Sequence, residues 1–312
     1  MLTNEAILNW LLEDDNPGVR TRTLTGLCGY PEDHPAVTAS RRLVIRTLPA
    51  ARDLSWMSLK GQILTYNLTA LAESGLTGQD IPVKTVVDKI LAQPFDASCG
   101  DLMALRALVM LGYGNDPRLE ERLTTLKDVQ LPDGGWLCLH RVRKLKRVPK
   151  SCIRADMHGL LLFAELKRAG LPLRQDEQLI GYFLKRELFY RMDDPTQLVL
   201  NDHPGRRMTD IFFPSEYFRV GLPVLLYAFT VLGAGEAPEL EEAWRLLEEK
   251  QDADGRVLLE GTLPLNKAYL PKEKVGRPSK WATLYACLAW KHREYRNASI
   301  EAGTAGLPES VL

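Results

Sequence analysis

The stretch from residue 101 to residue 136, DLMALRALVMLGYGNDPRLEERLTTLKDVQLPDGGW, decides how we expect this chain to fold. Residues 101–111 place apolar side chains at helical spacing, and Gly112 follows as a usual helix end. Residues 115–117, Asn-Asp-Pro, then begin a second helix that runs to about Val129 and is amphipathic. The stretch therefore predicts an apolar helix, a glycine, an amphipathic helix and a turn.

The same order of elements recurs along the chain. Apolar helices are expected at 19–27, 60–73, 159–169 and 215–232, with amphipathic helices at 36–48, 83–93, 176–189 and 238–250. A first helix at about 4–12 and a last one at about 280–292 have no partner in sequence, so we expect them to pair and close a ring. We therefore predict an all-α fold, an (α/α)6 toroid in one domain of residues 1–296, with residues 297–312 as a poorly ordered C-terminal tail.

Composition excludes several classes of protein. Forty basic and 40 acidic residues give a net charge of zero, which argues against a nucleic-acid partner. The longest uncharged run is too short for the ~20 apolar residues of a membrane span, and we see no signal peptide. Five widely spaced cysteines do not indicate a disulfide framework. We expect a cytoplasmic protein.

The turn at 130–136, QLPDGGW, resembles the QW repeat of squalene and hopene cyclases, and residues 251–256, QDADGR, are similar to a degenerate copy. With the helix order, it makes the chain resemble the prenyltransferase and squalene-cyclase repeat superfamily, the terpenoid cyclase-like α/α toroids, in a small single-domain bacterial form. The resemblance implies a ring cavity that takes an isoprenoid. It also implies that Trp136 is buried against a neighbouring helix pair.

Complete catalytic motifs of that superfamily are not found. Residues 13–16, Glu-Asp-Asp-Asn, differ from the DxDD motif of cyclases, and residues 193–197, Asp-Asp-Pro-Thr-Gln, fail the DDxxD motif at its last position. The zinc set of protein prenyltransferases does not carry over either. The resemblance therefore predicts the fold more specifically than the activity.

Two cysteines and two histidines gather between residues 138 and 158, and thiolate and imidazole are ligands that zinc prefers. Cys152 and Asp156 are spaced to share one helix face. The candidate metal ligands are Cys99, Cys138, Cys152 and Asp156. Ordinary buried cysteines are the alternative, because the spacing is not a standard zinc pattern.

Candidate substrate-binding residues fall in two loops and at helix starts. Residues 141–150 carry six basic side chains and no acid, which favours a bound anion or a solvated loop. Aromatic residues near 210–219 favour either an apolar cavity or a packed ring centre. The candidates are Trp56, Arg143, Lys146, Phe213, Tyr217, Arg219, Lys280 and Trp281.

Most of the candidate residues lie at or next to the starts of the expected inner helices, and the chain enters all of these helices from one rim of the ring. The basic loop of residues 141–150 is expected to overhang this rim. Asp101, Asp156 and Glu216 are the candidate catalytic acids there. We expect a transferase, cyclase or lyase that acts on an isoprenoid or another small hydrophobic or anionic molecule. The alternative is a toroid of the same shape that binds a ligand or a protein without catalysis.

Overall fold

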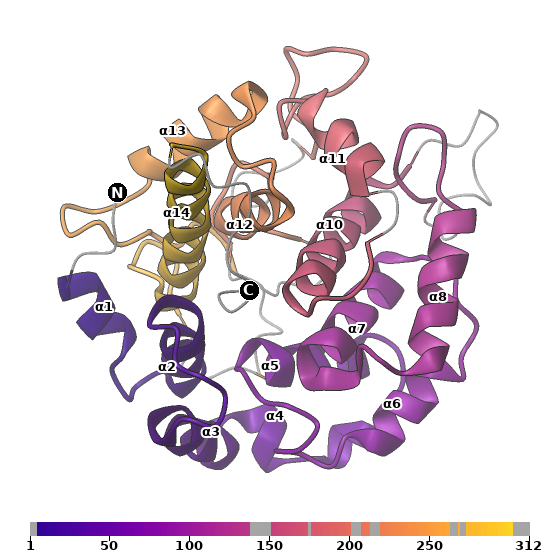
Figure 1. Cartoon of the computed structure of the whole chain (residues 1–312), viewed down its shortest axis with the longest axis vertical. Coiled ribbons are helices and arrows are strands. Elements are labelled where there is room, and N and C mark those ends of the chain that lie inside the picture. The colour runs from indigo at the N-terminus through magenta and orange to yellow at the C-terminus, as the bar shows by residue number, and fades with distance from the viewer. Residues whose placement is uncertain are drawn as a thin grey trace.

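The computed structural model describes residues 5–137, 151–173, 176–200, 207–212, 219–262, 268 and 273–301, the last seven by backbone only. Within these ranges the chain is α-helical, and extended pairing is limited to isolated bridges such as Gln251 with Val257. Two concentric layers of helices form a ring (Figure 1). The predicted all-α toroid is confirmed.

The inner layer consists of the more apolar helices and is found around the centre of Figure 1. Its members are α2 (Pro17–Arg22) with η1 (Thr23–Leu27), α5 (Gln62–Glu73), α7 (Cys99–Leu108) with η3 (Val109–Tyr113), α10 (Ile153–Arg168), α12 (Leu222–Leu232) and α14 (Lys280–Glu301). Every residue of α12 is buried, because this helix is covered on all sides. The backbone of α14 continues helical to Glu301, past the expected domain end at residue 296.

The outer layer consists of amphipathic helices. Its members are α1 (Glu5–Leu11), α3 (Pro35–Thr47), α4 (Pro49–Arg52), η2 (Ser55–Ser58), α6 (Lys84–Leu91), α8 (Pro117–Asp128), α11 (Asp176–Leu184), η4 (Pro238–Leu240) and α13 (Glu241–Glu249). In α13 the buried residues are Ala243, Trp244 and Leu247, at the spacing of one helix face. Gly112 and Gly233 have φ of 89° and 91°, the left-handed conformation that ends an inner helix.

The two ends of the chain close the ring. A Cβ atom on Gly18 of α2 would lie 3.2 Å from the Trp281 ring of α14, and Lys291 Nζ donates to Gly26 O at 2.9 Å. These contacts show that α14 runs beside α2 and η1 in the same direction. Lys280 Nζ also pairs with Glu13 at 2.7 Å, just beyond α1. The predicted closure by the first and last elements is therefore confirmed.

The turn at 130–136 packs as its sequence predicts. Trp136 is 1% exposed, and its Nε1 donates to Leu126 O at 2.8 Å. Its backbone N–H donates to Asp156 Oδ1 at 2.8 Å. The turn therefore ties the end of α8 to the start of α10. No helix among the described residues has the length and apolar content of a membrane span.

Candidate functional site

Most of the described sequence-predicted site residues act in packing or capping where the inner helices begin. Trp56 is buried and donates its Nε1 to Ala50 O at 2.8 Å. Asp101 Oδ2 accepts from Ser98 N at 3.1 Å and completes a capping box at the start of α7. Asp156 is fully buried beneath the turn that carries Trp136.

Some of the remaining candidates lie at this rim, and the others lie in ranges that the structure does not describe. Lys280 is 5% exposed and paired, Trp281 is 1% exposed, and Arg219 is half-buried. Cys99 is buried and Cys152 half-buried. Cys138, Arg143, Lys146, Phe213, Glu216 and Tyr217 lie outside the described residues. Within the described part of the chain, no three His, Cys, Asp or Glu side chains are grouped to hold a metal ion.

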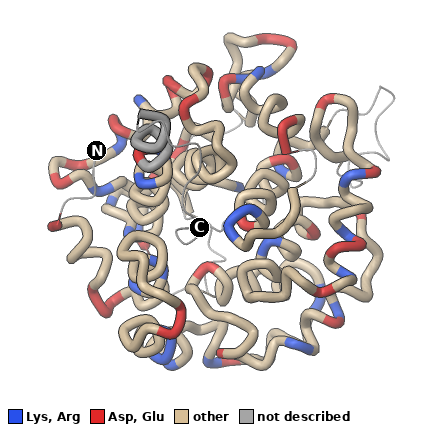
Figure 2. Tube along the Cα trace, in the orientation of Figure 1, with Lys and Arg blue, Asp and Glu red and all other residues tan. Residues whose placement is uncertain are grey.

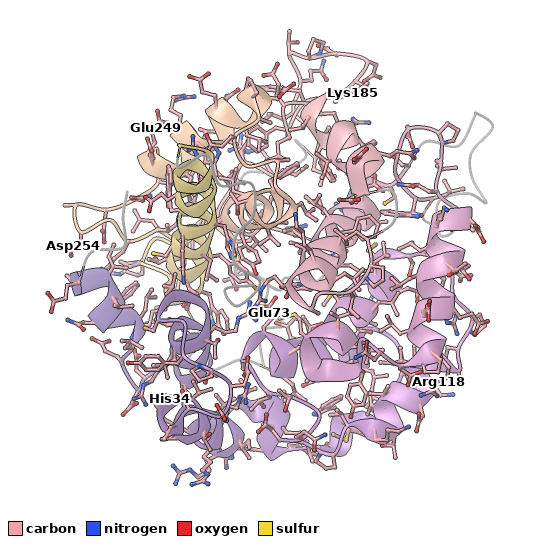
Figure 3. All side chains as sticks on the ribbon, viewed as in Figure 1. His34, Glu73, Arg118, Lys185, Glu249 and Asp254 are labelled. Carbon is pink, nitrogen blue, oxygen red and sulfur yellow. The ribbon has the colours of Figure 1, made fainter. Side chains whose placement is uncertain are left out.

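A cluster of charged side chains crosses the middle of the ring instead. Arg106 Nη2 of α7 lies 2.8 Å from Glu73 Oε1 of α5, with side-chain exposures of 3% and 0%. Arg106 also donates to Tyr285 Oη of α14 at 3.1 Å, and Tyr285 Oη donates to Glu73 Oε2. Glu73 lies near the ring centre in Figure 3. Side chains from three inner helices, α5, α7 and α14, are thus joined by an ion pair and two hydrogen bonds near the ring axis.

The same cluster continues into α10. Glu165 Oε2 lies 2.6 Å from Arg168 Nη1, and Glu165 Oε1 lies 3.7 Å from Arg106 Nη2. Burial alone would raise the pKa of Glu165, but the charges of Arg168, Arg22 and Arg106 lower it below its usual range. Glu165 is therefore a carboxylate that bridges two guanidinium groups at neutral pH.

Tyrosines and histidines in the cluster are neutral at pH 7. Burial, followed by the Glu73 carboxylate, raises the pKa of Tyr285 far above its usual range, and burial also raises that of Tyr227. Burial, with Arg106 second, lowers the pKa of His158 to about 3. Burial, with Arg168 second, lowers that of His292 to about 4. The fixed charges are therefore those of the arginines and glutamates.

A polar cavity of about 150 Å³ opens at the rim where inner helices end. Ala72, Met110 and Ala169, near the ends of α5, α7 and α10, form part of its wall. Its charged lining residues are Arg22, Glu32, Arg41, Glu165 and Arg168. Thr25 and Thr77 add hydroxyl groups to the lining. We call it the arginine cavity. Figure 2 shows basic and acidic positions on the inner helices as well as at the periphery.

The three arginines of the cavity differ in their partners. Arg41 pairs with Glu32, lies 3.8 Å from Asp80 and donates to Gly75 O at 2.8 Å. Arg168 is held by Glu165. Arg22 is 8% exposed, and among the described residues no carboxylate lies within ion-pair distance of its guanidinium. Arg22 is thus a buried cation at the wall of an open polar cavity.

The sequence carries one signal that could have predicted this cavity, namely charged residues within the apolar inner helices. Glu73, Arg106, Glu165 and Arg168 interrupt otherwise apolar helices. The predicted site residues lie at the starts of these helices, so the charged positions in their later turns were not among them.

The fold and the cavity define an all-α toroid with a polar, arginine-lined cavity at one rim. No known protein family matches the sequence, and no curated protein matches it either. Among solved structures, the chain is similar to a polysaccharide lyase, with a TM-score of 0.53 and 13% sequence identity over 91% of each chain. At this identity the likeness shows the fold alone.

Proposed function

We propose that this toroid binds a small anionic molecule in the arginine cavity. The observation that carries the proposal is Arg22, a buried guanidinium on the cavity wall with no carboxylate partner among the described residues. Glu165 favours the Arg22 charge from beyond ion-pair distance, and no described carboxylate touches the guanidinium at the cavity wall, so a ligand can supply one there. Guanidinium groups bind carboxylate and phosphate oxygens in a planar, two-bond geometry.

The charge balance of the cluster supports an anion. Arg22, Arg106 and Arg168 carry three positive charges, whereas the buried Glu73 and Glu165 carry two negative ones. The excess of one positive charge is confined to these groups, because Arg41 at the cavity has both Glu32 and Asp80 beside it. A volume of about 150 Å³ matches a ligand group of about the size of a benzene ring. One carboxylate or phosphate with a small attached body fits these limits.

Catalysis by the same toroid is the second candidate. The structural likeness to a polysaccharide lyase favours it, since an acidic saccharide would present a carboxylate to the arginines. An isoprenoid, the substrate implied by sequence resemblance, would find mainly polar groups in the arginine cavity. Incubating the protein with acidic polysaccharides and measuring new chain ends tests lyase activity. No turnover would leave the binding function alone.

We also propose a second site at the rim where the inner helices begin. Asp101, Asp156 and Glu216 would act there as acids, with zinc held by the four candidate ligands. Metal analysis of protein purified without a His-tag tests the zinc site. A cytoplasmic location, proposed from the cysteine usage, would be checked by fractionation of the source cells.

Anion binding itself is tested by thermal unfolding in a phosphate-free zwitterionic buffer. The probes are inorganic phosphate, acetate and gluconate, with choline as a cationic control. A ligand present at 100 times its Kd stabilises the fold by about 2.7 kcal/mol, so a bound anion raises Tm. Arg22→Met should abolish this rise, whereas Arg42→Met, at an exposed position of α3, should retain it. Equal responses in both variants would refute the proposal.

A further inference from the structure

The arginines of the arginine cavity differ in the hydrogen-bond donors that they leave for a ligand. Arg41 uses all three nitrogens of its guanidinium within the protein, because Nε donates to Gly75 O at 2.8 Å and Nη1 to Glu32 O at 3.3 Å, while Nη2 pairs with the Glu32 carboxylate. No hydrogen bond within the described ranges engages the guanidinium of Arg22, and its nitrogens are not among the fully enclosed atoms that lack a partner. Arg22 therefore offers free donors to the cavity that it lines.

The hydroxyl groups that line the cavity can act toward a ligand only as acceptors. Thr25 Oγ1 lies 3.2 Å from Thr21 O, and Thr77 Oγ1 lies 2.8 Å from Asp80 Oδ2. Carbonyl and carboxylate oxygens only accept, so each threonine donates its proton inside the protein. The carboxylate of Glu32, whose side chain is 69% exposed, is a further acceptor in the lining. A simple anion would use the donors of the cavity and leave these acceptors unused.

One donor and one acceptor of the cavity are neighbours on the same helix. Arg22 and Thr25 are three positions apart on a helix that continues from α2 into η1, and both line the cavity. Side chains at this spacing lie side by side, with about 5–6 Å between their Cβ atoms. An acid that carries a hydroxyl on the carbon next to its carboxylate presents the complementary groups side by side as well.

We propose that the anion bound in the arginine cavity is a small 2-hydroxy acid, of the lactate or glycerate class. Its carboxylate bonds to Arg22, and its hydroxyl donates to Thr25 Oγ1. The inference rests on the proposed anion site and specifies the ligand of that site. An acid of about three to four carbons fits a volume of about 150 Å³, since a cavity of this size holds benzene. A hydroxyl is favoured over an ammonium group because the charged cluster that includes Arg22 already has an excess of one positive charge.

Propionate, lactate and alanine test the proposal, because they share one carbon skeleton and carry a hydrogen, a hydroxyl and an ammonium group at the same carbon. Saturation-transfer NMR on their methyl protons, with the full chain at constant ionic strength, gives a Kd for each acid. Lactate should bind about threefold to tenfold more tightly than propionate, which is the gain expected from one hydrogen bond. Alanine should bind no more tightly than propionate.

Variants at Thr25 test the assigned acceptor. Thr25→Val removes the hydroxyl with little change of volume, so the affinity for lactate should fall to that for propionate while the affinity for propionate stays unchanged. Thr25→Ser keeps the oxygen and should keep the preference for lactate. Thr124→Val, at an exposed position of α8, is the matched control. A loss of packing would weaken both acids together, whereas a lost hydrogen bond weakens lactate alone.

Three results would overturn the inference and leave the anion site standing, provided that the acids still bind and need Arg22. They are equal affinities for lactate and propionate, tighter binding of alanine than of lactate, and a preference for lactate that survives in folded Thr25→Val. If none of the acids binds the natural protein, the anion site and this inference fall together. If Thr25→Val does not fold, the ratio of the two affinities in the natural protein remains the test.

Discussion

Arg106 of α7 and Glu73 of α5 form an ion pair of 2.8 Å whose side chains are 3% and 0% exposed. Tyr285 of α14 bonds to both partners, so the pair joins helices that are far apart in sequence. Two charges taken out of water require good geometry and further hydrogen bonds to be tolerated. The ion pair therefore joins the three helices, and the stability of the ring depends on it.

Glu73→Gln should destabilise the protein by about 3–5 kcal/mol, because it leaves the Arg106 charge buried with only the more distant Glu165 opposite it. Unfolding in urea measures the change. The double variant Glu73→Met with Arg106→Met should recover most of the loss, and Glu121→Gln at an exposed position of α8 should have little effect. A loss below about 1 kcal/mol in Glu73→Gln would show that the pair does not hold the ring.

His158 and His292 should each remove stability as the pH falls from about 6.5 to 4, and Asp156 and Glu273, whose pKa values are raised by burial, should oppose this loss. His158 and His292 have folded-state pKa values lowered to about 3 and about 4, whereas an unfolded histidine titrates near 6.5. In this window each histidine binds more protons in the unfolded chain than in the folded one, which favours unfolding by up to about 1.4 kcal/mol per pH unit for each histidine. Tm recorded against pH for the natural protein and for His158→Gln isolates the His158 contribution, and the variant should lose less stability than the natural protein on acidification. An unchanged slope of Tm against pH in that variant would contradict the assignment.

Gly159→Ala should destabilise α10 by about 1–3 kcal/mol, because the added Cβ would lie 2.3 Å from Cζ3 of Trp136. Gly181→Ala in α11 is the matched control, since its Cβ would have no atom within 4 Å. There the gain in helix propensity should stabilise the protein by about 0.5–1 kcal/mol. Denaturant unfolding compares the two, and equal stabilisation by both would mean that Trp136 does not pack as described.

Asp156→Asn should be no less stable than the natural protein at pH 8. Burial raises the pKa of Asp156 well above its usual range, so the folded state holds this proton more tightly and loses stability as the pH rises. Asn keeps an acceptor for Trp136 N and removes the ionisation. Asp156→Ala removes the acceptor and should lose stability at all pH values. If an enzymatic activity is found, its loss in a stable Asp156→Asn variant would support a catalytic role for Asp156.

Helix order and ring closure could be predicted because glycines such as Gly112 and Gly233 end the apolar helices and recur along the chain. The burial of Trp136 followed from its place in a QW-like turn. Several helix boundaries were wrong: the helix expected at 159–169 is Ile153–Arg168, and the one expected at 176–189 ends at Leu184. In the segment expected at 215–232, residues 219–221 are not helical and α12 begins at Leu222, while residues 213–218 lie outside the described ranges.

The arginine cavity could not be predicted in the same way. Arg22, Arg41 and Arg168 are separated by up to 146 positions, and only ring closure brings α2, α3 and α10 around one cavity. Whether an arginine has a carboxylate partner depends on distances between helices, and the helical periodicity of a sequence does not give these distances. Asp101 and Asp156 were selected for their place at helix starts, where capping and turn contacts also require carboxylates.

Arg22→Met should change stability by no more than about 1 kcal/mol in either direction in buffer without small anions. The substitution removes a buried charge together with its attraction to Glu165, and it leaves Arg106 and Arg168 balanced by Glu73 and Glu165. Methionine keeps most of the buried aliphatic stem. Urea unfolding measures the change. A loss of more than about 2 kcal/mol would indicate that Arg22 is needed for packing rather than for a ligand.

Titration calorimetry of the most stabilising anion tests the central claim most directly, with the natural protein, Arg22→Met and Arg42→Met measured in the same buffer. We predict one site per chain in the natural protein and in Arg42→Met. In Arg22→Met we predict at least tenfold weaker binding, a loss of about 1.4 kcal/mol or more. Equal affinity for the anion in all three folded proteins would contradict an anion site at Arg22.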